Sequence, residues 1–309
     1  MKKISVVTPC FNEEENVEEL YHAVRNVMAG FKSYDYEHIY IDNASTDRTP
    51  EILRRLATAD SRVKVIINSR NFGHIRSPFY GLLQANGDAV VYMASDFQDP
   101  PETIPRFIEK WEQGYKTVVG VKNQSEETPL FFFVRKCYYK LIRRLADIEV
   151  IQNFTGFGLY DKTVVDFCRT VQDPYPYFRG LISEIGFDIA PVEFVQPTRK
   201  RGLTKNNIYT LYDLAMLGFT NHSKVPLRLA TILGFAMSFL SLLVGLGYLI
   251  YKLLFWSLFS TGMAPVVIGL FLFSSVQLFF IGILGEYIGA IHTQVLHRPL
   301  VVEKERINF

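Results

Sequence analysis

The chain has few cysteines and lacks the glycine-rich motifs by which many enzymes hold a phosphate. Its 309 residues include three cysteines, Cys10, Cys137 and Cys168, without a C-x-x-C pair or a nearby pair of histidines. This spacing argues against a zinc site and a disulfide framework, and it is typical of a reducing compartment. Because neither G-x-G-x-x-G nor G-x-x-x-x-G-K-S/T occurs, we expect no pyrophosphate site of the dehydrogenase or P-loop kind.

A strong net charge is also absent. The formal charge is +2, so the composition does not point to nucleic acid as a partner. The N-terminus, MKKISVVTPCFNEEEN, soon turns acidic and has no apolar stretch of the length found in a signal peptide. We therefore expect the N-terminal domain to stay in the cytoplasm.

Charged residues disappear from much of the last third of the chain. None occurs in the 23 positions from Leu229 to Tyr251 or in the 33 positions from Leu253 to Gly285. A helix that crosses a bilayer needs about 20 apolar residues, so both windows are long enough. Two buried helices of a soluble protein are the alternative, but such windows seldom follow each other in a soluble chain. We predict two transmembrane helices.

Basic residues flank the two predicted spans. Lys224 and Arg228 precede the first span, and Arg298, Lys304 and Arg306 follow the second. An excess of Lys and Arg marks the cytoplasmic side of a membrane protein. We therefore predict that both chain ends lie in the cytoplasm.

Before Gln124, short apolar runs alternate with helical patterns whose apolar residues share one face. This alternation predicts an α/β domain with a mainly parallel sheet covered by helices on both faces. The predicted strands are Ile4–Thr8, Tyr36–Ile41, Val63–Asn68, Ala89–Met93 and Thr117–Val121. The predicted helices are Glu13–Gly30, a helix with Thr49 as N-cap and Pro50 as its first residue, Ile75–Ala85 and Glu102–Trp111.

After Gln124 the pattern is less regular. Phe154–Tyr160 and Ile189–Val195 are predicted as strands. Leu130–Leu145 and Asn207–Phe219 have the spacing of amphipathic helices. We expect these two helices to lie at the membrane surface.

Polar residues follow three predicted strands at the point where each strand ends. Open α/β sheets bind ligands beyond the carboxyl ends of their strands, so we expect these loops to form one site. Mg²⁺ typically takes one or two carboxylates together with substrate phosphates, which makes Asp96 and Asp99 candidate metal ligands. The three loops are Pro9-Cys10-Phe11-Asn12-Glu13, Asp42-Asn43-Ala44-Ser45-Thr46-Asp47 and Ser95-Asp96-Phe97-Gln98-Asp99.

Each of these loops also has a structural explanation. Asp42 could be a turn residue, Asn12-Glu13 could cap the following helix, and Asp99-Pro100-Pro101-Glu102 could be a helix start. The coincidence of three polar strand exits favours a functional site.

A second concentration of charge lies in the segment Thr198–Lys205. Four cations fall within seven residues just before the second interfacial helix, namely Arg199, Lys200, Arg201 and Lys205. Because guanidinium groups bind phosphate in a bidentate manner, this segment is a candidate for binding a substrate phosphate. Contact with anionic lipid headgroups is the alternative.

The motifs VVTPCFNEEENV, IDNASTDRT, RNFGH and SDFQDPPE, in this order and spacing, resemble family 2 glycosyltransferases with the GT-A fold. RKRGLTK, the two hydrophobic helices and LGEYIGAIHTQVLHRP resemble the polyprenyl-phosphate glycosyltransferases, relatives of dolichol-phosphate mannose synthase. Within that group the chain is most similar to the Gtr-type bactoprenol glucosyltransferases. The resemblance covers nearly the whole chain.

The resemblance implies roles for the residues that match the family motifs. A Mg²⁺ or Mn²⁺ ion would be bound by Asp96, with Asp99 as a helper. The implied catalytic residues are Asp96, Arg201 and Lys205, of which the two cations would meet phosphates. The residues implied to bind the nucleotide sugar are Pro9, Asn12, Glu13, Asp42, Asn71, Gly73, Ser95, Gln98 and Arg199.

The chain departs from the family pattern at the metal motif. The family has D-x-D-L-Q, whereas this chain has Ala94-Ser95-Asp96-Phe97-Gln98, so the first carboxylate is missing. Asp99 or the substrate phosphates could replace it. The departure also leaves a non-catalytic nucleotide-sugar binding module as an alternative.

The resemblance implies an inverting transfer of a hexose, glucose from UDP-glucose, to undecaprenyl phosphate at the cytoplasmic face of the bacterial plasma membrane. Such a protein takes part in O-antigen or cell-envelope glycosylation. Mannose, galactose or aminoarabinose are alternative sugars, and a flippase-associated component is an alternative class. Two spans and an interfacial helix leave room for a homo-oligomer, including a tetramer.

The expected domain organisation has four parts. Residues 1–198 form the cytoplasmic catalytic domain and residues 199–226 the basic loop and interfacial helix. Residues 227–290 form the two transmembrane helices, and residues 291–309 form a cytoplasmic tail.

Overall fold

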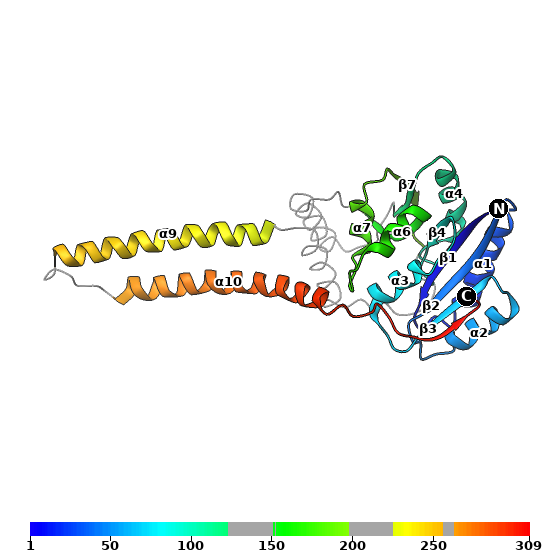
Figure 1. The fold of residues 1–309 in the computed structure, drawn as a ribbon, viewed down its shortest axis with the longest axis horizontal. Coiled ribbons are helices and arrows are strands. Elements are labelled where there is room, and N and C mark those ends of the chain that lie inside the picture. Colours follow the sequence, from blue (N-terminus) through cyan, green and yellow to red (C-terminus); the bar gives the residue numbers. More distant parts are fainter. Residues whose placement is uncertain (123–150, 152, 198–224, 256–262) are drawn as a thin grey trace.

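A mixed sheet forms the centre of the structure, a computed structural model that describes residues 1–122, 151, 153–197, 225–255 and 263–309 (Figure 1). Within these residues the sheet has eight strands in the order β7-β5-β6-β4-β1-β2-β3-β8. The strands are β1 (Lys2–Cys10), β2 (Tyr34–Asp42), β3 (Val63–Asn68), β4 (Ala89–Tyr92), β5 (Thr117–Lys122), β6 (Phe154–Asp161), β7 (Ile189–Phe194) and β8 (Glu303–Ile307).

Parallel pairing joins the central strands. β1 pairs in parallel with β2 and with β4, and β2 pairs in parallel with β3. β5 and β7 are also parallel, whereas β6 runs antiparallel to β4 and β5, and β8 runs antiparallel to β3. The predicted α/β class is confirmed, and the sheet is parallel from β4 to β3, where strands and helices alternate in the sequence.

Helices cover both faces of the sheet, as the sequence predicted. They are α1 (Val17–Ala29), α2 (Thr49–Ala59), α3 (Gly73–Leu83), the short η1 (Pro101–Thr103), α4 (Ile104–Glu112), α6 (Lys162–Thr170) and α7 (Phe178–Glu184). Ile4 of β1 belongs to a buried cluster with Leu20 of α1 and Phe107 of α4. Val7 of the same strand belongs to another cluster with Leu82 of α3. Residues an odd number apart in a strand face opposite sides of the sheet, so α1 and α4 cover one face and α3 the other.

The predicted N-cap residue of α2 is wrong. Arg48 is the N-cap residue of α2, and Thr49 is already inside the helix. The Thr49 hydroxyl accepts a hydrogen bond from the backbone N–H of Glu13 at 2.8 Å instead of capping its own helix. The Thr49 hydroxyl, which the sequence pattern predicted as the cap of α2, therefore stabilises the loop after β1.

The sequence analysis missed α6, α7 and β8. Strand β8 lies within residues 291–309, for which only a tail was expected. Its Glu305 forms an ion pair with Arg54 of α2 at 2.8 Å. Just beyond it, the Asn308 side chain donates hydrogen bonds to the carbonyl oxygens of Ala57 and Val63 at 2.7 and 2.9 Å. The end of the chain is thus held on the edge of the sheet (Figure 1).

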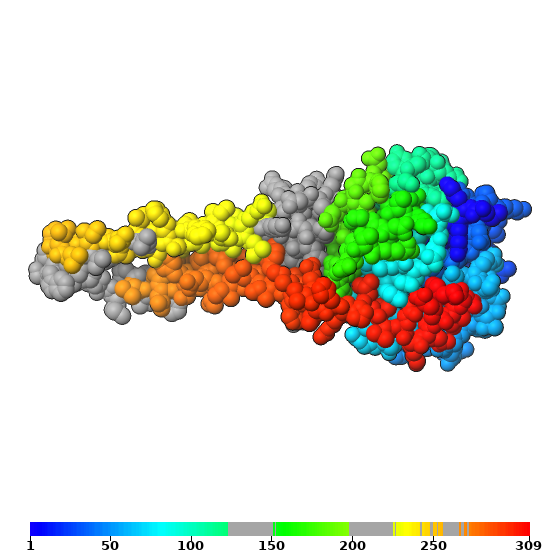
Figure 2. All heavy atoms as spheres, in the orientation of Figure 1, coloured from blue at the N-terminus to red at the C-terminus, as the bar shows by residue number. Residues whose placement is uncertain are grey.

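Two long apolar helices, α9 (Val225–Leu254) and α10 (Met263–Val295), extend away from the sheet (Figure 1). They contain two segments that are long and apolar enough to cross a membrane, Leu227–Gly247 and Leu272–Val295. Neither segment is buried within the described part of the chain, and Figure 2 shows the pair as an exposed rod beside the domain. Since exposure of so much apolar surface to water is unfavourable, these helices fit the predicted association with a membrane.

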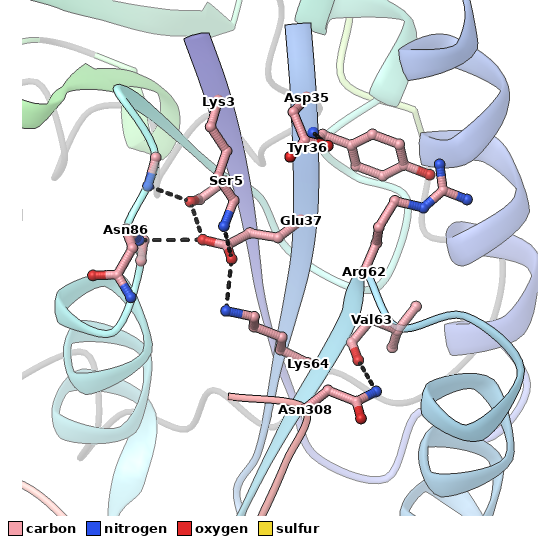
Figure 3. Close-up of polar contacts among 12 residues, drawn as sticks. Lys3, Ser5, Asp35, Tyr36, Glu37, Arg62, Val63, Lys64, Asn86 and Asn308 are labelled. Carbon is pink, nitrogen blue, oxygen red and sulfur yellow. Dashed lines mark hydrogen bonds and ion pairs between the residues drawn. The ribbon is translucent and has the colours of Figure 1, made fainter. Parts of the chain in front are cut away.

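A buried carboxylate, Glu37, joins three strands at the amino end of the sheet (Figure 3). Its side chain forms ion pairs with Lys3 of β1 and with Lys64 of β3, the latter at 2.8 Å. The Ser5 hydroxyl and the backbone N–H of Asn86 donate to its second oxygen at 2.5 and 3.2 Å. Burial opposes the charged form, but these donors outweigh it and lower the pKa of Glu37 from 4.5 to about 2.

Replacement of Glu37 by Gln is expected to destabilise the protein by roughly 3 kcal/mol, because the two lysines lose their shared counter-charge. Thermal unfolding of the detergent-solubilised full chain, followed by circular dichroism at neutral pH, measures this loss. Glu51→Gln is the matched control, since the Glu51 side chain is 72% exposed, and it should leave the melting temperature unchanged.

The same substitution should also change how stability depends on pH. Because the folded pKa of Glu37 lies below its ordinary value, its contribution is present above about pH 4.5 and is lost as the pH falls toward about 2. The melting temperature of the wild type should therefore fall more steeply over this range than that of Glu37→Gln. Parallel pH profiles would contradict this role for Glu37.

Candidate active site

The polar strand exits predicted from the sequence meet at one edge of the sheet. In the parallel register, Cys10 of β1 lies opposite Asp42 of β2, and Val7 of β1 lies opposite Tyr92 of β4. The loops after β1 and β2 therefore start at the same level, and the loop after β4 starts three residues earlier along β1, at the same carboxyl edge of the sheet. This arrangement confirms the reasoning that brought the three exits together.

The first two exits are tied to each other through Asn12. This residue has a φ of 57°, a conformation that Asn tolerates better than most residues. Its backbone N–H donates to the Ser45 hydroxyl at 2.8 Å, and its side-chain oxygen accepts from the backbone N–H of Thr46 at 2.8 Å. The loops after β1 and β2 thus form a single unit.

Asp42 lies at the base of this unit and is fully buried. It accepts hydrogen bonds from the backbone N–H of Ser45 at 3.0 Å and from the Ser45 hydroxyl. Burial raises the pKa of Asp42, although the Ser45 donors oppose that shift. These hydrogen bonds support the explanation of Asp42 as a turn residue. Its contact with a nucleotide remains a prediction.

Glu13 is also largely buried and organises the start of α1. The Asn16 side chain donates to the Glu13 carboxylate at 2.6 Å. The backbone N–H groups of Asn16 and Val17 donate to the Glu13 carbonyl at 2.9 and 3.0 Å. The N-cap residue of α1 is Asn16, so Glu13 stabilises the turn before the helix, and the helix-cap alternative for the Asn12-Glu13 pair is wrong.

The sequence analysis missed the hub of the site, Asn43. Its side-chain nitrogen donates to Asn71 Oδ1 and to the Gly73 carbonyl at 3.0 and 3.1 Å. Its side-chain oxygen accepts from the backbone N–H of Phe72 at 2.9 Å and from the Asn68 side chain at 3.2 Å. Asn43 therefore holds the predicted nucleotide-contacting residues Asn71 and Gly73 against the β2 exit. Its place in the polar loop after β2 was the available signal.

The β4 exit folds back on itself around Asp99. Phe97 has a φ of 60°, and the backbone N–H of Gln98 donates to the Asp96 carboxylate at 3.2 Å. The backbone N–H of Ala94 donates to Asp99 at 2.8 Å. Ser95 and Gln98, both predicted to bind the nucleotide sugar, flank Asp96 in this loop.

Asp99 is only 5% exposed, which affects its charge. Burial raises the pKa of Asp99 to about 7, and the nearby charge of Asp96 adds to the increase. The Ala94 N–H and Lys122 act in the opposite direction. An inward-facing carboxyl of this kind favours the structural explanation for Asp99, while its role as a metal helper stays a prediction. Among the described residues, no group of three or more His, Cys, Asp or Glu side chains is arranged to hold a metal ion.

A cavity of about 250 Å³ lies beside β4 on the α3 and α7 side. Its lining is mostly apolar and includes the aromatic rings of Tyr92 and Phe178, whose centroids are 6.0 Å apart. His74 and Arg179 contribute polar groups to the wall. The cavity is adjacent to the strand whose exit carries Asp96.

The predicted phosphate-binding residues Arg199, Arg201 and Lys205 lie outside the described residues. Their roles therefore remain predictions from the sequence.

Comparison with known proteins identifies the family. The family described as "Glycosyl transferase family 2" matches residues 5–168, which include all three polar exits. The chain belongs to glycosyltransferase family 2. The predicted enzyme class and family are thereby confirmed.

Relatives of this family 2 glycosyltransferase align over almost its whole length. The bactoprenol glucosyl transferase of Shigella phage SfV is 34% identical over 98% of both chains. An uncharacterized glycosyltransferase of Bacillus subtilis, YkcC, is 36% identical over 96% of this chain and 92% of the relative. Among solved structures, glucosyl-3-phosphoglycerate synthase from Mycobacterium tuberculosis with Mn²⁺ and UDP-glucose has a TM-score of 0.45 and 21% identity. That comparison covers 70% of this chain and 76% of the other.

Replacement of Asn43 by Ala is expected to raise the KM for the nucleotide sugar by about tenfold, because four hydrogen bonds that hold residues 68–73 are lost. Steady-state kinetics of the purified full-length enzyme measures this change. Thr58→Ala, which removes an exposed hydroxyl on α2, is the control. A tenfold lower kcat with an unchanged KM would contradict the positioning role.

Proposed function

We propose that this enzyme transfers glucose from UDP-glucose to undecaprenyl phosphate, with inversion, at the cytoplasmic face of the bacterial plasma membrane. The proposal rests on how much of this chain is similar to its relatives. Relatives named bactoprenol glucosyl transferase align over 98% of this chain, whereas the family domain matches only residues 5–168. The similarity therefore also includes the two apolar helices, as expected for proteins that use a membrane lipid.

The nucleotide would bind across the exits of β1, β2 and β3. Asp42 is proposed to meet the uracil and ribose, with Pro9, Asn12 and Glu13 forming the adjoining loop. Asn71 and Gly73 would contact the base from the third exit. The hydrogen bonds from Asn12 to the β2 exit and from Asn43 to the β3 exit support this grouping.

The chemistry of Asp96 fits a divalent cation. Mg²⁺ is commonly held by one or two carboxylates together with substrate phosphates, so the absence of a carboxylate at Ala94 does not exclude it. Asp96 would be the main metal ligand. Asp99 would at most be an additional ligand, because it accepts a hydrogen bond from the Ala94 N–H. Bound there, Mg²⁺ or Mn²⁺ would neutralise charge on the departing diphosphate.

The acceptor phosphate would need cations more than a base. A phosphate monoester has a second pKa of about 6, so its oxygen is largely anionic at neutral pH. Arg199, Arg201 and Lys205 are proposed to hold that oxygen beside the negatively charged donor. Direct attack of the phosphate oxygen on the anomeric carbon expels UDP and inverts the configuration, giving a β-linked product from an α-linked donor.

The proposal keeps the expected organisation of the chain. Residues 1–198 would form the catalytic domain, 199–226 the basic loop and interfacial helix and 227–290 the two spans. Strand β8, within residues 291–309, completes the sheet of the catalytic domain, and both chain ends would lie in the cytoplasm. A homo-oligomer, including a tetramer, is compatible with two spans per chain. A panel of nucleotide sugars assayed with undecaprenyl phosphate tests glucose against mannose, galactose and aminoarabinose.

The missing carboxylate at Ala94 motivates a second candidate function, a non-catalytic module that binds nucleotide sugars. The purified full-length chain with Mg²⁺ and undecaprenyl phosphate distinguishes the two functions. Release of UDP from a nucleotide sugar supports the enzyme, and binding of the sugar without any release supports the module.

Replacement of Asp96 by Asn is expected to lower UDP release by at least about 100-fold, because the main proposed metal ligand loses its charge. The melting temperature should stay close to that of the wild type. Asp166→Asn is the control, since Asp166 lies on α6 with a side chain that is 49% exposed. An unchanged rate in Asp96→Asn would refute the metal assignment.

A further inference from the structure

Three arginines from separate segments gather where the domain meets α10. Arg70 follows β3, Arg76 lies on α3, and Arg298 comes three residues after the end of α10. The guanidinium carbons of Arg70 and Arg76 lie 4.1 and 5.5 Å from the centroid of the Phe72 ring. Arg76 also donates a hydrogen bond to the carbonyl of Pro299, which follows Arg298. We call these three residues the arginine cluster.

The arginine cluster has no acidic partner in the described part of the chain. The ion pairs found there involve none of the three side chains. Arg76 Nε is buried without a hydrogen-bond partner. Burial lowers the pKa of Arg76, and the charges of Arg70 and Arg298 add to this effect. Three like charges held together in this way favour a bound anion.

The position of the cluster indicates where that anion comes from. The candidate span in α10 ends at Val295, so Arg298 lies within three residues of the end of the apolar segment. Residues at that distance from a span lie at the level of the lipid headgroups. After Arg298, the chain runs along the surface of the domain to β8 (Figure 2).

We propose that the arginine cluster binds the phosphate of an anionic phospholipid headgroup. Guanidinium groups bind phosphate oxygens in a bidentate manner and remain charged at all physiological pH values. The face of Phe72 supports two of the three guanidinium groups. The cluster therefore offers several donors to one phosphate.

The phosphate of the acceptor is a poorer occupant. In the sheet order, β3 is three strands away from β4, and adjacent strands are about 4.8 Å apart, so the two exits are separated by roughly 14 Å. The reacting phosphate must lie beside the anomeric carbon, close to Asp96 on the β4 exit. A phosphate held beside Arg70 at the β3 exit is therefore farther from Asp96 than the reacting phosphate is expected to be.

Headgroup binding would also act on the donor site, and this step rests on the proposed function. Arg70 is adjacent to Asn71, whose side-chain oxygen accepts hydrogen bonds from Asn43 and from the backbone N–H of Gly73. A phosphate that holds Arg70 and Arg298 together would fix this donor loop to the end of α10. We therefore expect the anionic lipid to lower the KM for the nucleotide sugar and to leave kcat unchanged.

The binding of lipid is measured in the absence of the enzymatic reaction. The full-length protein in neutral detergent is mixed with phosphatidylglycerol or phosphatidylcholine, and bound lipids are counted by native mass spectrometry. The wild type should retain more phosphatidylglycerol than phosphatidylcholine, and Arg298→Gln should lose most of this difference. Lys304→Gln removes the same charge from an exposed position on β8 and should behave as the wild type. Equal retention by Arg298→Gln and the wild type would overturn the proposal.

The effect on the donor loop is tested by kinetics in nanodiscs with a constant fraction of undecaprenyl phosphate. Addition of phosphatidylglycerol to phosphatidylcholine should lower the KM for the nucleotide sugar by roughly fivefold in the wild type and in Lys304→Gln. Arg298→Gln should not respond. If Arg298→Gln changes the KM for undecaprenyl phosphate instead, the cluster binds the acceptor and the proposal is wrong. If no variant turns over but lipid retention depends on Arg298, only the proposed function fails.

Discussion

The parallel pairing of β1 with β2 and β4 is the constraint on which the rest of the active-site edge depends. It sets the three polar exits side by side and lets the loop after β1 bond to the loop after β2 through Asn12. Asn43 then joins the exit of β3 to the same assembly. Asn12, Asn71 and Gly73 are therefore held by backbone register and by hydrogen bonds of short side-chain amides.

The two ends of the sheet use charge in different ways. At the amino end, Glu37 is fully engaged by two lysines and two further donors, so its charge serves stability. At the carboxyl end, Asp42 and Asp99 are buried, the ion pairs of the described residues include neither of them, and burial raises the pKa of each. The burial of Asp42 opposes folding, which agrees with its proposed role in binding, whereas Asp99 faces inward and accepts a hydrogen bond from the Ala94 N–H.

The sequence was most informative where hydrophobic pattern and topology act together. Val63–Asn68 was predicted to the residue because it is a buried apolar run, and the three exits followed from the alternation of strands and helices. The hub role of Asn43 could not be predicted, because it depends on contacts with residues 25 to 30 positions away. The strand Glu303–Ile307, EKERI, is too polar to stand out as a strand, and only its partners on β3 and α2 define it.

Strand β8 also restricts the membrane topology of the two predicted spans. If α9 and α10 cross the membrane as predicted, the pairing of β8 with β3 in one sheet requires the chain to return after α10 to the side of the bilayer from which it entered α9. The number of crossings between β7 and β8 is therefore even, whatever the distribution of flanking charges. The two helices form a hairpin inserted into a discontinuous domain. During synthesis, the last strand of the sheet becomes available only after both helices have left the ribosome, so the domain is completed after the hairpin is made.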